Sequence, residues 1–362
     1  MKDRPYPRSI PPSWRTRFAF EIRGRKFTWH EVVCAAEIRG DLAPLVEQGR
    51  YAQACEERAS TEGGVPDMGA VEAMMDEFRY ARSLVTVEET ERWLDAHGLT
   101  VDDLSDHFLR RYWLTAGAER TDEVSSELAS LPDVWPADLL ISGTFVRLTR
   151  AYAREALCAA RHQPPAESAA PILLSEFRRR RGFDLPTYAA WREEWELADS
   201  EVVGFLFGQQ SLELDQQQSL TIERRTNVLT ELRTGLVRME LVIAEFDSEA
   251  AAHEAHLCVT SDGRTLEDVA NETGFPIRQE SAFVREFPES WHLHLLGALP
   301  GRTLPPLPND ATFDVCRVVS SIEPQLTDAA VVAAVDAVLL ERQFGHLESQ
   351  EVRWHINVEI VA

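Results

Sequence analysis

The chain has 362 residues, of which 44% are hydrophobic and nine are tryptophan, a composition that favours a packed protein of two or three domains over a disordered one. Its 60 acidic and 37 basic side chains give a formal net charge of -23, which disfavours a nucleic-acid backbone or an anionic membrane as the main partner. Such a surface would tolerate a basic peptide, and the same charge also serves solubility alone.

The cysteines and the apolar runs exclude several other classes of protein. The five cysteines are Cys34, Cys55, Cys158, Cys258 and Cys316. An odd number at such wide spacing indicates neither a disulfide framework nor a zinc site. Residues 1–17 have no apolar signal core, and no run reaches membrane-spanning length, so we expect a cytoplasmic protein. The sequence has no phosphate loop, nucleophile elbow or dinucleotide fingerprint, and we therefore expect no cofactor.

The first part of the chain is predicted to be an arm and a strand followed by helices. Residues 1–17 are rich in proline and arginine, and we expect this arm to order only against a partner or the body of the protein. Alternating apolar residues over 18–27 predict a strand with a turn at 24–26, and Thr28 is placed to cap a helix that begins at Trp29. From there to about Leu212 the apolar spacing is helical.

An internal repeat lies within this helical part. The first copy carries Phe78, Thr86, Trp93 and Thr100, and the second carries Phe177, Asp184, Trp191 and Asp199 at nearly the same spacing. The threonines and aspartates are predicted to be helix caps, and the tryptophans are expected in the core. The pattern predicts an arm and strand over 1–28 and two helical units, 29–114 and 134–210.

Four consecutive arginines end a helix of the second copy. They are Arg178, Arg179, Arg180 and Arg181, and Gly182 follows them. In an acidic protein this run is a candidate docking site for an acidic peptide. Arginines also complement the negative end of a helix dipole, so a solvated helix end remains the alternative.

Residues 236–322 read as a smaller α+β part. Alternation places Val237, Met239, Leu241 and Ile243 on one face of a strand. Ser248 is predicted to cap the helix that follows, and a short helix from about 265 ends at Gly274. A second strand is predicted over 312–319.

The last part of the chain, 327–362, is predicted to be a helix and a terminal strand. The helix, over 327–344, is so apolar that it needs burial on more than one side. Residues 354–360 alternate cleanly, and we expect this strand to pair either with the strand at 18–27 or with the sheet of 236–322.

Residues 236–322 resemble the parvulin-type peptidyl-prolyl isomerase domain of PpiC and SurA proteins. The motif positions that match are Gly263, Leu266, Val269, Ala270 and Thr273, then Pro300, Gly301 and Pro305 or Pro306. The first helical copy also resembles the N-terminal chaperone segment of SurA-like proteins. The resemblance implies a multidomain, mainly α protein with duplicated SurA-like helical units and a C-terminal α+β parvulin-like domain.

The resemblance also implies a peptide pocket, although its histidines are missing. The expected pocket residues are Met239, Leu241, Phe283, Phe287, Trp291 and Phe313. Asp314 stands where a parvulin has a strand histidine, which makes it the candidate catalytic residue. Methionine and aromatic residues suit an adaptable peptide groove, and the same types would equally build a core.

The resemblance implies a peptide-binding chaperone, or an accessory protein in the maturation of a ribosomally synthesised peptide. Its ligand would be a precursor peptide or an unfolded peptide, and a tailoring enzyme would be a further partner. Its isomerase pocket would be degenerate. One alternative is an active isomerase that uses Asp314 or Cys316. Another is a peptide-modifying enzyme, or a subunit of one, with acid-base groups from His253, His256, His292 and His294. His253 and His256 share a helix face, but no second ligand pair accompanies them, so we expect no metal.

Overall fold

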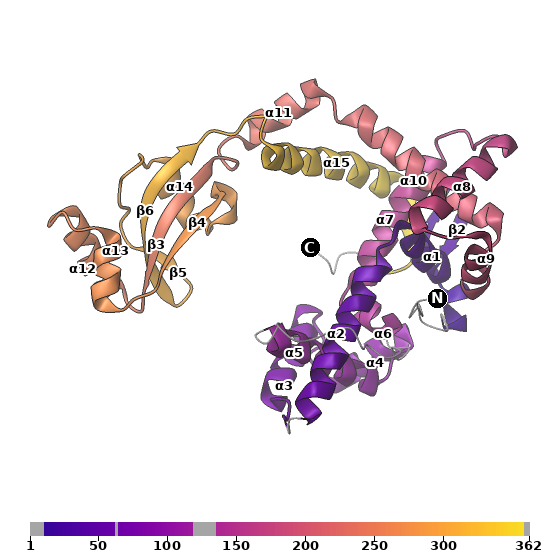
Figure 1. Cartoon of the computed structure of the whole chain (residues 1–362), viewed down its shortest axis with the longest axis horizontal. Helices are drawn as coiled ribbons and strands as arrows, with labels where there is room; N and C mark the ends of the chain where they lie inside the picture. Colours follow the sequence, from indigo (N-terminus) through magenta and orange to yellow (C-terminus); the bar gives the residue numbers. More distant parts are fainter. Residues whose placement is uncertain (1–10, 62–63, 119–134, 358–362) are drawn as a thin grey trace. The chain divides into compact units, whose positions relative to one another are not determined.

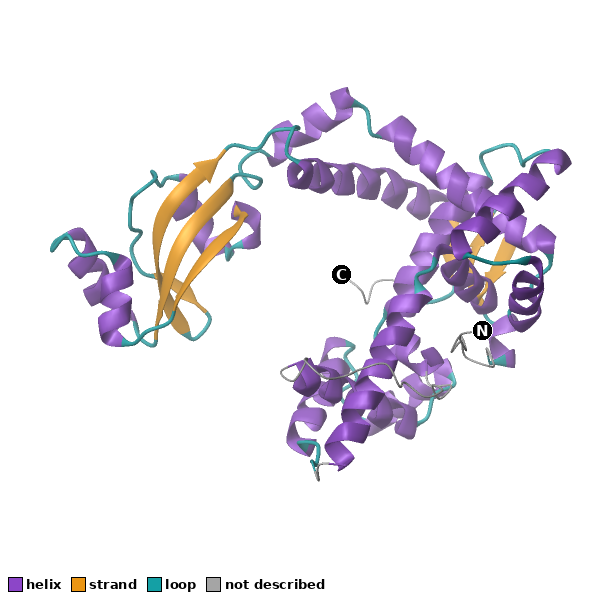
Figure 2. Cartoon of the chain, in the orientation of Figure 1, coloured by secondary structure: helices purple, strands orange, loops and turns teal. Residues whose placement is uncertain are grey.

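The computed structural model describes residues 11–61, 64–118 and 135–357, which are mostly helical and include two small antiparallel sheets (Figures 1 and 2). This confirms the predicted fold class, a helical part and an α+β part. The chain forms two compact units: unit 1 comprises residues 1–215 and 344–362, and unit 2 comprises 216–343. The finer division of unit 1 into two helical units stays a prediction, as does the N-terminal arm, most of which lies outside the described residues.

Unit 1 contains a three-stranded sheet of order β2-β1-β7. β1 (Phe18–Ile22) and β2 (Arg25–Thr28) form a hairpin, so the turn is one residue earlier than the sequence suggested. Arg23 and Gly24 have φ angles of 51° and 85°, and two positive φ values match the twist of a two-residue hairpin. β7 (Val352–Trp354) pairs with β1, one of the two pairings that we expected. Residues 358–360 of that expected strand lie outside the described residues.

The helices of unit 1 follow the caps in the sequence. They are α1 (Trp29–Arg39), α2 (Leu42–Thr61), α3 (Met68–Ala81), α4 (Val87–His97), α5 (Val101–Ala118), α6 (Trp135–Ile141), α7 (Thr144–Ala159), α8 (Ala170–Arg181), α9 (Leu185–Glu194) and α10 (Asp199–Ser219), which ends in unit 2, with 3-10 turns at Pro12–Arg15 and Glu167–Ala169. Thr28 and Thr86 form capping boxes, and Asp184 caps α9, as predicted. The prediction that Asp199 is a cap was wrong, because Asp199 is the first residue of α10.

The two copies of the repeat pack the same aromatic pair. The ring centroids of Phe78 and Trp93 lie 5.3 Å apart, and those of Phe177 and Trp191 lie 5.4 Å apart. Trp191 is buried, while Trp93 is partly buried against the same core. Both copies therefore contribute to a single hydrophobic core that also takes in the hairpin.

Unit 2 is built around a four-stranded antiparallel sheet of order β4-β3-β6-β5. Its elements are α11 (Ile222–Leu232), β3 (Arg238–Phe246), α12 (Glu249–Thr260), α13 (Leu266–Thr273), β4 (Ile277–Phe283), α14 (His292–Leu296), β5 (Leu307–Asn309), β6 (Thr312–Ile322) and α15 (Ala329–Glu351), which ends in unit 1, with 3-10 turns at Val284–Glu286 and Glu289–Trp291. Ser248 and Thr265 cap α12 and α13, and Gly274 ends α13 with a φ of 73°.

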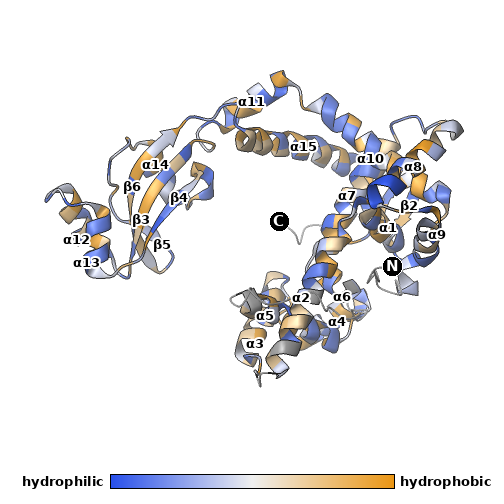
Figure 3. Cartoon of the chain, in the orientation of Figure 1, coloured by the Kyte–Doolittle hydropathy of each residue, from blue (hydrophilic) through white to orange (hydrophobic). Residues whose placement is uncertain are grey.

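Both faces of the sheet in unit 2 are covered. Met239, Leu241 and Ile243 of β3 pack toward α14 and the turns before it. The alternate residues of the strand, Val242 and Ala244, pack toward α12 and α13. Burial on both sides explains why β3 is mostly hydrophobic in Figure 3, whereas the edge strand β4 is mostly hydrophilic.

The apolar helix predicted over 327–344 is longer in the structure. Within unit 2, Val331 and Val335 of α15 pack with Val228 of α11. Arg225 adds a two-bond ion pair to Asp336, with N to O distances of 2.7 and 2.6 Å. In the described ranges, every helix is too short or too polar to span a bilayer. The cytoplasmic location stays a prediction.

Candidate functional site

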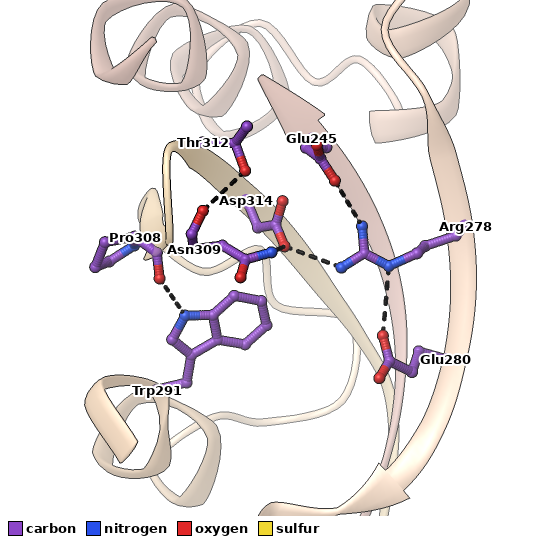
Figure 4. A network of polar contacts seen from close by, with 8 residues as sticks. All are labelled: Glu245, Arg278, Glu280, Trp291, Pro308, Asn309, Thr312 and Asp314. Atoms are coloured by element: carbon purple, nitrogen blue, oxygen red, sulfur yellow. Dashed lines mark hydrogen bonds and ion pairs between the residues drawn. The ribbon is translucent and has the colours of Figure 1, made fainter. Parts of the chain in front are cut away.

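The predicted catalytic residue, Asp314, lies inside the sheet of unit 2. It sits on β6 and is fully buried. Arg278 reaches across from β4 and donates to Asp314 Oδ2 at 3.0 Å, and Asn309 of β5 donates to the same oxygen at 3.1 Å (Figure 4). Arg278 also contacts Glu245 and Glu280, at 3.3 and 3.4 Å. Side chains from all four strands thus meet in one network.

This arrangement shields Asp314 from a ligand. Burial raises the pKa of its carboxyl above the usual value, while the Arg278 guanidinium and the Asn309 amide act in the opposite direction. Its Oδ1 is buried without a hydrogen-bond partner in the described part of the chain. A carboxyl group with no exposed surface and an ion-pair partner cannot contact a peptide bond unless the sheet opens.

The six expected pocket residues fall into three clusters. Met239, Leu241, Phe287 and Trp291 belong to the core on the face of α14. The Trp291 ring is 1% exposed, stacks on Phe287 with centroids 5.9 Å apart, and donates Nε1 to Pro308 O at 2.8 Å. Phe283 instead packs with α11 and α15, and Phe313 packs on the opposite face of the sheet. The structure therefore brings four of them together as packed side chains, and a peptide-binding role for any of the six stays a prediction.

The other acid-base candidates are separated or buried. Burial raises the pKa of the Cys316 thiol, which disfavours its thiolate. His253 and His256 lie on α12, whereas His292 and His294 lie on α14, and these helices cover opposite faces of the sheet. Among the described residues, no group of three or more His, Cys, Asp or Glu side chains is placed to hold a metal.

The arginine run divides into two exposed and two anchored side chains. Arg181 forms an ion pair with the buried Glu37 and also donates to the Glu37 carbonyl at 3.1 Å. Arg178 donates to Leu174 O and lies near the Tyr188 ring. Arg179 and Arg180 are exposed. An acidic partner could therefore reach Arg179 and Arg180, and docking there stays a prediction.

A groove in unit 1 was not predicted from the sequence. We call it the hairpin groove: a cavity of about 660 Å³ bounded by the β1–β2 hairpin, α1, α7 and α10. Its lining includes Phe27, Tyr152, Phe205 and Phe207. Ring centroids lie 5.6 Å apart between Phe27 and Tyr152 and 5.4 Å apart between Tyr152 and Phe205. Phe27, Tyr152 and Phe205 belong to the buried core of unit 1, and the half-buried Phe207 is the most exposed of the four. The groove thus lies over aromatic rings of the core.

Charged side chains and two glycines complete the hairpin groove. Arg25 pairs with Glu31 at 3.3 Å on its rim. On α10, Gly208 packs closely against Glu155: a Cβ atom at Gly208 would lie 3.3 Å from the Glu155 Cβ. A Cβ atom at Gly204 would have no described atom within 4 Å. Gly204 thus leaves open space beside the helix.

Solved structures of foldases and SurA-like chaperones resemble this chain. PrsA of Bacillus cereus, a peptidylprolyl isomerase, matches over 66% of this chain and 95% of its own, with 9% identity and a TM-score of 0.33. PrsA of Bacillus subtilis matches over 60% and 82%, with 11% identity and a TM-score of 0.20. A structure from work on two SurA-like chaperones of Campylobacter jejuni matches over 62% and 88%, with 9% identity and a TM-score of 0.22.

The matches confirm the resemblance to SurA- and PpiC-type proteins that the sequence motifs indicated. No family model matches the chain, and no curated protein matches it. At these identities and TM-scores the solved structures carry no argument about the substrate or activity of this chain.

Proposed function

We propose that this protein is a peptide-holding chaperone, which binds an extended unfolded or precursor peptide in the hairpin groove and does not catalyse prolyl isomerisation. The observation that carries the proposal is the groove itself, a cavity of about 660 Å³ that lies over aromatic rings of the core. Beside Gly204 and the half-buried Phe207 the groove offers an apolar surface that can accept different side chains, as a holding protein requires.

The rim of the groove supports binding of peptides rather than of a single small ligand. Arg23 and Arg25 stand on the hairpin side, and Glu201 and His162 stand on the helical side. Charged groups of both signs at the edge of an apolar floor match the polar backbone and mixed side chains of a peptide. Gly204 lets a chain approach the backbone of α10 without a steric barrier.

The filled sheet of unit 2 supports the absence of isomerase activity. Rotation about a prolyl peptide bond has a barrier of roughly 18–20 kcal/mol, and lowering it requires a pocket that holds the proline. On the face where the resemblance places that pocket, Trp291 is stacked on Phe287 and Asp314 is shielded. A proline ring would have to displace core side chains.

The resemblance to PpiC-related maturation proteins extends the proposal to the natural ligand. We infer a ribosomally synthesised precursor peptide that passes from the groove to a tailoring enzyme. A short precursor gene and a tailoring-enzyme gene beside the gene of this protein are the expected finding. Absence of these genes would contradict the inferred natural ligand. It would not bear on peptide binding in the groove, which is tested separately.

The test is an NMR titration of the whole chain with a short apolar peptide that contains proline. We expect chemical-shift changes in the protein, with no increase in the rate of proline isomer exchange over the uncatalysed tens of seconds. Gly204→Phe should fill the groove and weaken binding by about tenfold or more, while Gly204→Ala, the matched control, should bind like the wild type.

Two results would contradict the proposal. Faster isomer exchange that disappears in Asp314→Asn would make the sheet of unit 2 a working isomerase site. Equal binding by Gly204→Phe and Gly204→Ala, with both variants folded by circular dichroism, would exclude the hairpin groove as the peptide site.

A further inference from the structure

A second cavity of unit 1 lies among α2, α5, α6 and the start of α7, and we call it the four-helix pocket. Its volume of about 310 Å³ falls at the lower end of small-ligand sites, roughly 300–1,000 Å³. It shares no lining residue with the hairpin groove. A role for it is therefore independent of the proposed function.

Part of the lining of the four-helix pocket is apolar. Leu42 and Val46 of α2, Leu114 of α5 and Leu139 of α6 contribute to it. Leu42 and Leu139 are buried, while Val46 and Leu114 are half-buried. This part of the lining offers a ligand apolar contact.

Another part of the lining is positively charged. His107 Nδ1 and Arg110 Nη2 each lie 2.7 Å from Asp138 Oδ1, so one carboxylate is shared by two partners. Arg110 Nε is buried and has no hydrogen-bond partner among the described residues. Arg111 and Arg147 also line the pocket, and both are exposed. Three arginines thus face one aspartate, in a chain whose net charge is -23.

Gly49 gives a second indication that the pocket receives a ligand. It lies within α2 and lines the pocket, yet an ideal Cβ built there has no described atom within 4 Å. Glycine inside a helix is less stable than alanine, and here neither a positive φ nor a close neighbour requires it. The half-buried backbone at Gly49 is open to a group that enters the pocket.

We propose that the four-helix pocket binds an aliphatic monocarboxylate, with its chain along α2 at Gly49 and its carboxylate on Arg110 and Arg147. The guanidinium group matches a carboxylate in two parallel hydrogen bonds, and the apolar part of the lining takes the chain. Arg147 donates to Thr144 Oγ1 at 2.8 Å, which restrains its side chain at the pocket. A free fatty acid and the last residue of a peptide offer this same chemistry.

The test is calorimetric titration of the full chain with decanoate, below the concentration at which it forms micelles, and with decanol as the uncharged control. We expect decanoate to bind the wild type and decanol to bind at least about tenfold more weakly. Gly49→Phe should abolish decanoate binding by filling the pocket, and Gly49→Ala should preserve it. Arg147→Gln changes an exposed residue and should weaken decanoate binding while leaving the fold intact.

Peptides that end in leucine, with a free or an amidated C-terminus, distinguish the sources of the carboxylate. Binding of the free form without decanoate binding assigns the pocket to a peptide terminus, and the reverse assigns it to a fatty acid. Three results would overturn the proposal. Decanoate and decanol could bind equally well, or neither decanoate nor the free peptide could bind. The third result is decanoate binding that Gly49→Phe does not change. Gly204→Phe should leave decanoate binding unchanged, which separates this result from that of the hairpin groove.

Discussion

The sheet face around Asp314 and the hairpin groove use similar side chains to opposite effect. Each combines aromatic rings with arginine and a carboxylate. On the sheet, the turn before α14 places Trp291 over β3 and β6, and the ring is 1% exposed. In the hairpin groove, Gly204 leaves the space beside α10 open. Three rings of the groove are buried, as Trp291 is: Phe27, Tyr152 and Phe205. The two regions therefore differ in the open space beside Gly204 and not in their rings. The comparison indicates that an uncovered helix surface, rather than the residue types, leaves room for a ligand.

The buried carboxylates of the two regions differ in how many hydrogen bonds they accept from side chains. Asp314 accepts hydrogen bonds from two side chains, Arg278 and Asn309. Glu155, which packs beneath the hairpin groove against Gly208, accepts one from Arg39, and its Oε2 has no partner among the described residues. Burial raises the pKa of Glu155 to about 7, against the attraction of Arg39. Burial raises the pKa of the Asp314 carboxyl as well, against the attraction of Arg278.

Removing the ring that fills the sheet face should have the largest effect. Trp291→Ala should lower the free energy of unfolding of unit 2 by about 3 to 5 kcal/mol, because it leaves a large cavity in a packed core. Urea denaturation followed by circular dichroism measures this loss. Leu293→Ala, two residues further along in α14 and 86% exposed, is the matched control and should change the value by less than about 0.5 kcal/mol.

The same variant can break the comparison between the two regions. A Trp291→Ala protein that keeps the stability of the wild type and gains affinity for proline peptides would show that the ring closes a binding site. The sheet face would then belong with the hairpin groove as a peptide site, and the proposal of a single peptide groove would be wrong.

The next largest effect concerns Glu155 and pH. Its folded pKa of about 7 lies above the value of 4.5 for an unperturbed glutamate, so the folded state binds the proton more tightly. The stabilisation is complete below pH 4.5 and is lost as the pH rises through about 7. This group alone should lower the stability of unit 1 by up to about 3 kcal/mol between pH 5 and pH 8.

Glu155→Gln cannot titrate, so its stability should fall less over this pH range than that of the wild type. Urea denaturation at a series of pH values measures the difference, and Glu213→Gln, a change at an exposed residue, serves as the control. Burial also raises the pKa of Glu37, so part of the pH dependence should persist in Glu155→Gln. Parallel curves for the wild type and Glu155→Gln would show that Glu155 is already ionised at pH 5.

Two variants of the arginine run, at one anchored and one exposed residue, should show a smaller effect on stability. Arg181→Gln should destabilise unit 1 by about 2 kcal/mol, because Glu37 loses its ion-pair partner inside the protein. Arg179→Gln should change the stability by less than about 0.5 kcal/mol, since Arg179 is exposed. Urea denaturation of the two variants measures both values. Similar losses of stability in the two variants would mean that the arginine run stabilises the helix end as a whole. In a separate binding measurement, weaker binding of an acidic peptide by Arg179→Gln would support docking at the run.

Local features of this protein followed from its sequence. The caps at Thr28, Thr86 and Asp184, the glycine that ends α13 and the alternation of β3 each depend on residues only a few positions apart. The aromatic repeat was visible for the same reason, because each copy is a short and nearly continuous pattern. These signals were enough to predict a helical part followed by an α+β part.

The tertiary structure alone decided where the side chains meet. Phe313 and Asp314 are neighbours in sequence, yet the alternation of β6 places them on opposite faces of the sheet. The hairpin groove joins residues from the β1–β2 hairpin with residues of α7 and α10, and the four-helix pocket joins α2 with α5 and α6. Such sites depend on the register of strands and the packing of helices far apart in the chain, which no short pattern encodes.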